Sequence, residues 1–159
     1  RYYKLKNGNI IDLNNNSELN ELSNLFDDLS IFADKLASLE DTVEKRKQEF
    51  LESFGKAGVF YYVVYETAVP VGIIKVIEEP DAYEIASFYL LEKYRNKGYG
   101  KQTIVYLKTV LSPKRIRLWV LEDNKKAIRF YEDNGFEFFG NTRLINRGQS
   151  YTQLQYESL

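Results

Sequence analysis

A basic segment that contains two glycines carries the clearest chemical signal in the chain. Tyr94 to Thr103 reads YRNKGYGKQT, with Gly98 and Gly100 between Arg95, Lys97 and Lys101, where a strand ends and a helix must begin. A helix start offers unpaired backbone N–H groups and a partial positive charge, and glycine lets an anion come close to them. The segment predicts an anion site suited to phosphate. A tight strand-to-helix turn would use the same glycines.

Two familiar phosphate-binding patterns do not fit this segment. A dinucleotide fingerprint needs a third glycine, and the residue at that position is Thr103. A P-loop needs a longer spacer that ends in Gly-Lys-Ser/Thr. Taken alone, the two glycines therefore identify no cofactor.

The residue inventory limits the other chemistry. The 159 residues include no Cys and no His, which excludes thiolate nucleophiles, disulfides and His-based triads. Acid–base chemistry must then use carboxylates, Tyr, Lys or water. Residues 1–90 hold 16 acidic and 9 basic residues, whereas residues 91–159 hold 7 and 13. The basic half favours an anionic partner, and the acidic half mildly favours a cationic one, although charge spread for solubility would also produce such counts.

The elements that must position these residues follow from periodicity. The pattern predicts strands on both sides of an Asn7-Gly8 turn, then helices from Ser17 and from Asp41 to Gly55. Strands are expected at 59–66, 69–79, 83–91, 115–122, 136–145 and 150–158, and helices at 101–111 and 124–135. The alternation of strands and helices from 83 to 140 requires at least one parallel crossover. We expect one domain over residues 1–159, with a mixed α/β sheet flanked by helices.

Two segments at a suitable distance resemble the GNAT superfamily of acyl-CoA-dependent N-acetyltransferases. Arg95-Asn96-Lys97-Gly98-Tyr99-Gly100 matches the family's Arg/Gln-x-x-Gly-x-Gly/Ala signature. Residues 118–140, LWVLEDNKKAIRFYEDNGFEFFG, match a second block through Asn124, Ala127, the Phe130-Tyr131 pair and Gly135-Phe136. The resemblance covers about residues 59–140 well, and the rest fits only in the order of its elements.

The resemblance implies a binding mode for acetyl-CoA as co-substrate. The strand before the glycines would part from its neighbour, and the pantetheine arm would pair with backbone groups of Phe88 and Leu90. The backbone from Lys97 to Lys101 would hold the pyrophosphate, with Arg95, Lys97, Gly98, Tyr99, Gly100 and Lys101 as the cofactor-binding set. Asn124 would bond the cofactor arm, although an Asn at that position also makes a good helix N-cap.

The resemblance also suggests two catalytic residues. Tyr131 would protonate the departing thiolate, although a buried aromatic residue would look the same. Glu84 would act as base on the amine, directly or through water, although it could be a solvated carboxylate. Glu122 is a weaker candidate for the base. Alignment of two bound reactants supplies much of the rate in any case.

The resulting prediction is a cytoplasmic enzyme that transfers acetyl directly from acetyl-CoA to a primary amine, without a metal. The acceptor would be a small molecule or a peptide, and the protein a monomer or homodimer. No apolar run reaches the roughly 18 residues of a membrane span, and no nucleic-acid motif appears. The alternative is an acyl-CoA-binding sensor or partner module without catalysis. The identity of the amine and the length of the acyl group stay open.

Overall fold

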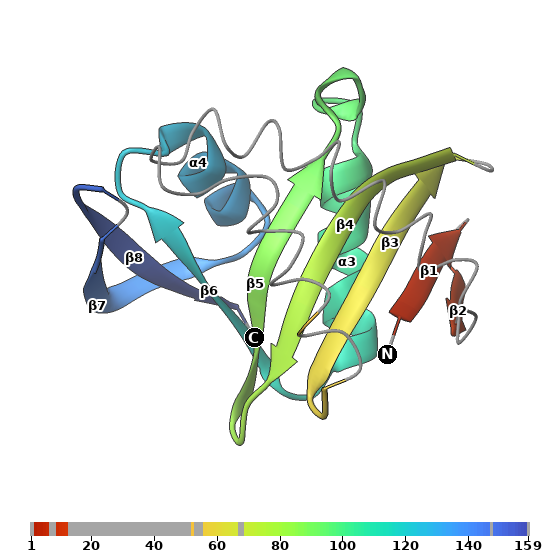
Figure 1. Cartoon of the computed structure of the whole chain (residues 1–159), viewed down its shortest axis with the longest axis horizontal. Coiled ribbons are helices and arrows are strands. Elements are labelled where there is room, and N and C mark those ends of the chain that lie inside the picture. Colours follow the sequence, from red (N-terminus) through yellow and green to blue (C-terminus); the bar gives the residue numbers. More distant parts are fainter. Residues whose placement is uncertain are drawn as a thin grey trace.

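The computed structural model describes residues 2–6, 9–12, 52, 56–66, 69–146 and 148–158. The predicted helix from Ser17 lies outside these residues, and so does the predicted helix from Asp41 to Gly55 apart from Glu52, which is helical. The described elements form one eight-stranded sheet with two helices (Figure 1). None of the described helices is long and apolar enough to cross a membrane.

The sheet is mixed, with the strand order β2-β1-β3-β4-β5-β6-β8-β7. Two neighbouring pairs, β1 with β3 and β5 with β6, are parallel, and the other pairs are antiparallel. The parallel β5–β6 pair confirms the predicted crossover. The strands are β1 (Tyr2–Lys6), β2 (Asn9–Asp12), β3 (Val59–Glu66), β4 (Val69–Glu78), β5 (Ala82–Leu90), β6 (Arg115–Leu121), β7 (Glu137–Asn146) and β8 (Ser150–Ser158).

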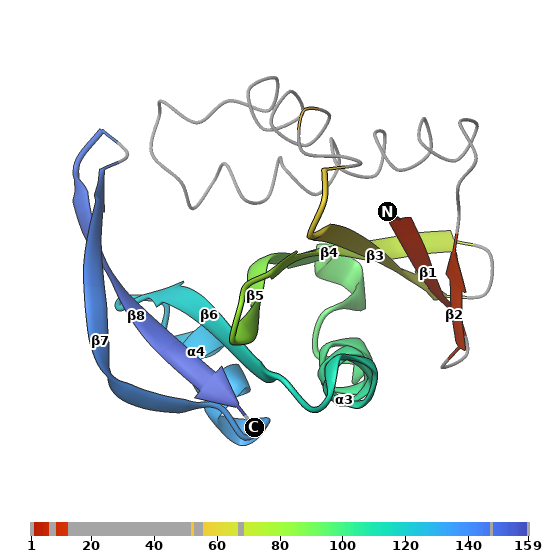
Figure 2. The same cartoon turned by 90° about the horizontal axis from the view of Figure 1, so that it is seen from below.

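Both helices lie on the same side of the sheet (Figure 2). Helix α3 (Tyr99–Leu111) buries Thr103, Ile104, Leu107 and Leu111, which recur at helical spacing. Helix α4 (Lys125–Asp133) buries Ile128. With apolar side chains of β3 to β6 and β8 they form one core that includes Ile74, Leu118 and Phe136. This side of the sheet is called the helix face below, and the other side the opposite face.

The connections at the helix ends follow the sequence signals closely. Asn124 accepts a bond from the Ala127 N–H at 3.2 Å and so caps α4. Gly135 follows α4 with φ of 87°, as expected for a glycine stop. Helix α3 begins two residues earlier than predicted, because Gly98 itself takes the N-cap position with φ of 89°.

Strands β5 and β6 pair over only part of their length. The parallel register runs from Ala82–Arg115 to Ile85–Leu118, although β5 continues to Leu90 and β6 to Leu121. A bulge at Ala86 interrupts the pairing of β5 with β4 just beyond the last β5–β6 pair. Bulges bend a strand and increase its twist. The bulge therefore accounts for the point at which β5 leaves β6, and the two strands part beyond it.

Candidate active site

The backbone polar groups of Phe88 and Leu90 on β5 point toward the side of β6, beyond the place where the two strands part. The Leu91 N–H donates to the Val71 carbonyl on β4. Because backbone groups alternate sides along a strand, those of Phe88 and Leu90 point away from β4. Their side chains lie on the helix face, where the Phe88 ring meets Phe130 edge-on with centroids 6.4 Å apart. Both predicted roles, core side chain and cofactor-facing main chain, are compatible with this arrangement.

Arg95 turns back onto strand β5. Its Nε donates to the Leu90 carbonyl at 3.0 Å, across the short 3₁₀ turn Glu92–Tyr94. The predicted role of Arg95 was a positive charge beside the pyrophosphate. The observed bond adds a structural role, since it fixes the segment before α3 and occupies the Leu90 carbonyl. Because its carbonyl already accepts this bond, Leu90 would offer a ligand its backbone N–H.

The two glycines serve different purposes. Gly98 has φ of 89°, and a Cβ built on it would meet nothing within 4 Å, so its backbone conformation and open surroundings set it apart. A Cβ on Gly100 would come within 3.0 Å of the Phe130 ring. Gly100 therefore allows α3 to approach α4. The sequence pattern assigned both glycines to the anion site or the turn and did not predict this packing role. Of the two, Gly98 best fits the predicted anion cradle.

Charged and aromatic side chains surround the start of α3. Lys97 and Lys101 are exposed, and Lys97 Nζ lies 5.9 Å from the centroid of the Tyr94 ring. Tyr99 packs edge-on against Tyr94 at 6.0 Å. Its hydroxyl donates to the carboxylate of Glu66, and this bond is the main reason why the pKa of Tyr99 is raised. The Tyr99 side chain thus has a partner on β3, while its backbone lies at the helix start.

Asn124 occupies the N-cap of α4, as the sequence allowed. The cap uses its side-chain oxygen and leaves the amide nitrogen as the donor that a cofactor carbonyl would need. Glu122 is exposed, and its backbone N–H bonds to the Thr152 carbonyl on β8. An exposed carboxylate is a weaker candidate for the base than the half-buried Glu84.

Tyr131 on α4 is partly buried and packs against two aromatic rings. The centroids of Phe130 and Phe136 lie 5.2 and 5.5 Å from that of Tyr131. Burial raises the pKa of the Tyr131 hydroxyl well above its ordinary value, and the neighbouring Tyr89 raises it further. The hydroxyl is therefore protonated at neutral pH and available as a donor. Tyr89 comes from the opposite face of β5, so the two tyrosines approach each other where β5 and β6 part.

Glu84 lies on the opposite face, one residue before the end of the β5–β6 pairing. It is the register partner of Ile77 on β4 and of Arg117 on β6. Partial burial and the charge of Glu79 raise the pKa of Glu84, against the opposing effects of Arg143, Arg117 and Lys75. A raised pKa makes a carboxylate a better proton acceptor at neutral pH.

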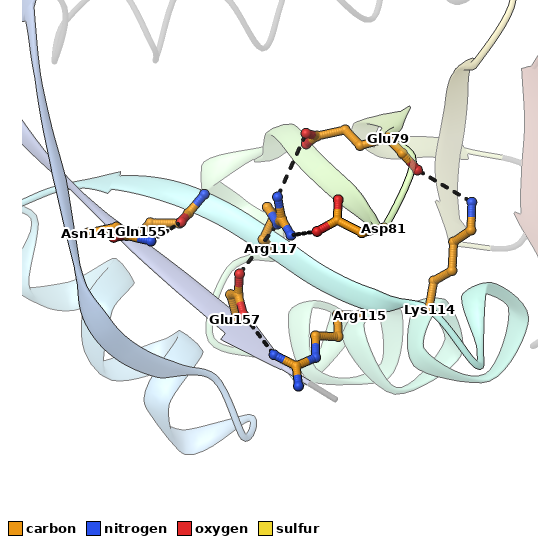
Figure 3. A network of polar contacts seen from close by, with 8 residues as sticks. All are labelled: Glu79, Asp81, Lys114, Arg115, Arg117, Asn141, Gln155 and Glu157. Carbon is orange, nitrogen blue, oxygen red and sulfur yellow. Dashed lines mark hydrogen bonds and ion pairs between the residues drawn. The ribbon is translucent and has the colours of Figure 1, made fainter.

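The guanidinium of Arg117 is engaged by other carboxylates (Figure 3). Its Nη2 lies 2.8 Å from Asp81, its Nε lies 3.4 Å from Glu157, and its Nη1 lies 3.8 Å from Glu79. Within the described residues, no ion pair to Glu84 exists. Because three acidic groups hold Arg117, its charge only partly opposes the raised pKa of Glu84. Among the described residues, Glu84 thus keeps a carboxylate without an ion-pair partner.

Sequence reasoning missed several features of this region. Alternation within Phe88-Tyr89-Leu90 would place the Tyr89 side chain on the other face from its two neighbours. The bulge at Ala86 adds one residue to the strand, so alternation alone could not tell that Tyr89 shares the face of Glu84. Asn96 takes a left-handed conformation with φ of 59°, which Asn tolerates better than most residues, and the sequence reading gave it no role. Trp119 and Arg143, which stack on the opposite face, were also not singled out.

Comparison with known proteins places this arrangement in one class. The fold is similar to that of a putative acetyltransferase from the GNAT family of Bacteroides thetaiotaomicron, at a TM-score of 0.69 and 19% identity over 89% of this chain and 82% of that one. A PaiA N-acetyltransferase from Thermoplasma acidophilum, solved in complex with coenzyme A, aligns at a TM-score of 0.63 and 19% identity over 89% and 92%. These likenesses show the fold.

The sequence identifies the family. Residues 21–136 match the model of the acetyltransferase (GNAT) family, so the chain belongs to that family. A spermine/spermidine N(1)-acetyltransferase from Bacillus subtilis (strain 168) is 40% identical over 57 residues, which are 33% of this chain. The aligned part spans 38% of that relative's length.

Proposed function

We propose that this protein transfers an acetyl group from acetyl-CoA directly to a primary amine. The observation that carries the proposal is the parting of β5 and β6 beyond Ile85 and Leu118, with a candidate acid and a candidate base beside it. Tyr131 lies on the helix face and Glu84 on the opposite face. The family match supports the same reaction class.

The residues present fit coenzyme A. The backbone N–H groups of Phe88 and Leu90 face the space that β6 vacates, where the pantetheine arm would pair with them as an added strand. The start of α3 at Gly98, with exposed Lys97 and Lys101, suits a pyrophosphate. The amide nitrogen of Asn124 supplies one further donor. The bound thioester supplies the activated acetyl group.

Each catalytic candidate would handle one proton. Glu84 accepts a proton from the ammonium group of the acceptor, directly or through water. The neutral amine nitrogen then bonds to the thioester carbonyl carbon, the carbon–sulfur bond breaks, and the second proton of the nitrogen passes to water. Tyr131 hydrogen-bonds to the departing sulfur and supplies its proton, and the Tyr131 hydroxyl regains a proton from water. The products are an N-acetyl amide and a free thiol, with no covalent enzyme intermediate.

A thiol-release assay with acetyl-CoA across a panel of amines tests the proposal. The panel contains spermidine, putrescine, amino acids, amino sugars and a lysine peptide, because the acceptors of family relatives include polyamines. Amine-dependent thiol release with an N-acetyl product is expected. Tight binding of acetyl-CoA without thiol release for any amine would instead support the sensor module. A parallel series of longer acyl-CoA donors determines the acyl length.

A further inference from the structure

Arg143 belongs to the face of the sheet on which Glu84 lies. Glu84 and Arg117 are register partners, and neighbouring partners in a sheet project to the same side. Trp119 lies two residues beyond Arg117 on β6 and projects with it. The guanidinium of Arg143, on β7, stacks over the Trp119 ring at 4.3 Å. All four side chains therefore project from the opposite face, beside the point where β5 and β6 part.

Two contacts support the exposed guanidinium of Arg143. Its Cζ lies 4.3 Å from the centroid of the Trp119 ring, and its Nε donates to Oε1 of Gln153 on β8 at 2.6 Å. Two supports on different strands restrict a side chain that would otherwise sample many rotamers. The pair of terminal nitrogens, Nη1 and Nη2, forms the fork that binds carboxylates and phosphates through two parallel bonds.

Arg143 differs from the other arginines of this face in its partners. Arg115 and Arg117 both pair with carboxylates of the network in Figure 3. Across the described part of the chain, no carboxylate lies within ion-pair distance of Arg143. Its charge nevertheless acts on Glu84, where it opposes the rise of the carboxyl pKa. Among the described residues, Arg143 is thus a cation without a carboxylate partner, and its charge reaches the candidate base.

We propose that Arg143 binds an anionic oxygen group of the acceptor while Glu84 receives its amine. The inference rests on the proposed acetyl transfer and narrows its substrate class to amines that carry a carboxylate or phosphate. A second ammonium group at the same place would be repelled by Arg143. The acceptor class therefore differs from the polyamines of the family relative and from the cationic acceptor that the charge balance of the sequence favours.

Three amines of similar length test this inference. γ-Aminobutyrate ends in a carboxylate, putrescine in a second amine and butylamine in a methyl group, and phosphoethanolamine supplies the phosphate arm. Binding to the acetyl-CoA-free and CoA-bound protein is measured by calorimetry, beside the kcat/KM for acetylation. We expect one of the anionic amines to bind and react roughly 10- to 100-fold better than butylamine, as one charged bidentate contact would give.

Variants of Arg143 test whether this residue causes the preference for anionic amines. Arg143→Ala is expected to lower the binding affinity for the preferred anionic amine by the same factor and to leave the binding affinity for butylamine unchanged, whereas the rates with both amines also carry the change in the pKa of Glu84. Arg143→Lys keeps the charge without the fork and should recover only part of the affinity. Arg143→Glu should invert the preference toward putrescine. Arg129→Gln, which removes an exposed charge from α4, is the matched control and should leave all acceptors unchanged.

The outcomes separate the two proposals. Absence of thiol release with every amine would overturn the proposed function, whereas the binding preference for an anionic amine would still support the role of Arg143. Equal binding of γ-aminobutyrate, phosphoethanolamine and butylamine would overturn the inference even if acetylation occurs. An equal loss of binding affinity for all amines in Arg143→Ala would also overturn it, because a structural role does not distinguish acceptors.

Discussion

At the scale of single residues, the environment of Tyr131 determines what its hydroxyl can do. Burial and, to a smaller extent, the neighbouring Tyr89 raise its pKa, so the group holds its proton at neutral pH. A thiol has an ordinary pKa of about 8.5. Tyr131 is thus a weaker acid than the thiol that it would protonate. Its strongest contribution would be a hydrogen bond that builds up as negative charge develops on sulfur.

Tyr131→Phe removes this donor and keeps the ring packing. We expect turnover to fall by about 10²- to 10⁴-fold, the usual contribution of a positioned acid, with little change in coenzyme A affinity. Single-turnover kinetics and calorimetry provide the two readouts. Tyr106→Phe, a half-buried tyrosine of α3, serves as the control. Wild-type turnover in Tyr131→Phe would exclude the hydroxyl from the reaction.

Glu84→Gln tests the base through pH. At neutral pH we expect the rate to fall by about 10²-fold or more, and then to recover about tenfold per pH unit as the amine itself becomes neutral. The control is Glu122→Gln at an exposed carboxylate. Superimposable pH–rate profiles for wild type and Glu84→Gln would remove Glu84 from the mechanism.

Stability provides an independent reading of the same group. The folded state raises the pKa of Glu84 above its ordinary 4.5, so the folded protein binds this proton more tightly than the unfolded chain does. Its contribution to stability is therefore greatest at low pH and is lost as pH rises from 4.5 through the raised value. Gln carries no such cost, and Glu84→Gln should accordingly gain stability relative to wild type across that window.

At the scale of elements, the segment before α3 combines two left-handed residues with a side chain that folds back. Asn96 and Gly98 have positive φ, and Arg95 bonds to the Leu90 carbonyl. Together they fix where the helix begins. The sequence predicted the helix and its glycine turn. The fold-back of Arg95 depends on where β5 ends in space, which local patterns do not encode.

Gly98→Ala tests whether this segment binds the pyrophosphate. Alanine at positive φ costs about 1–2 kcal/mol without any clash here. Gly140 on β7 has φ of 102° and equally open surroundings, so Gly140→Ala carries the same backbone cost. We expect similar losses in urea unfolding for both variants, and at least a tenfold loss of coenzyme A affinity only for Gly98→Ala. Equal affinities would leave Gly98 a turn residue alone.

At the scale of the whole molecule, the sequence predicted most of the elements but not their order in the sheet. The bounds of β3 to β8 fall within one residue of expectation, because alternation and turn residues mark them locally. The placement of β8 between β6 and β7 depends on long-range pairing, for which the sequence carries no local signal. The bulge at Ala86 was missed for the same reason. The parting of β5 and β6 was expected only from the family resemblance.

The parted strands leave the sheet with missing hydrogen bonds that a ligand can complete. The N–H groups of Phe88 and Leu90 face away from β4, whereas that of Leu91 is bonded to Val71. Without ligand, deuterium should replace the first two amide hydrogens quickly, and with coenzyme A bound their exchange should slow about tenfold or more. Residue-resolved NMR exchange measures this directly, and the Leu91 amide, already protected, gives the internal reference. Unchanged rates at Phe88 and Leu90 would mean that the cofactor does not pair with β5. Slowed rates would make these two amides a direct reporter of cofactor occupancy that requires neither turnover nor knowledge of the acceptor.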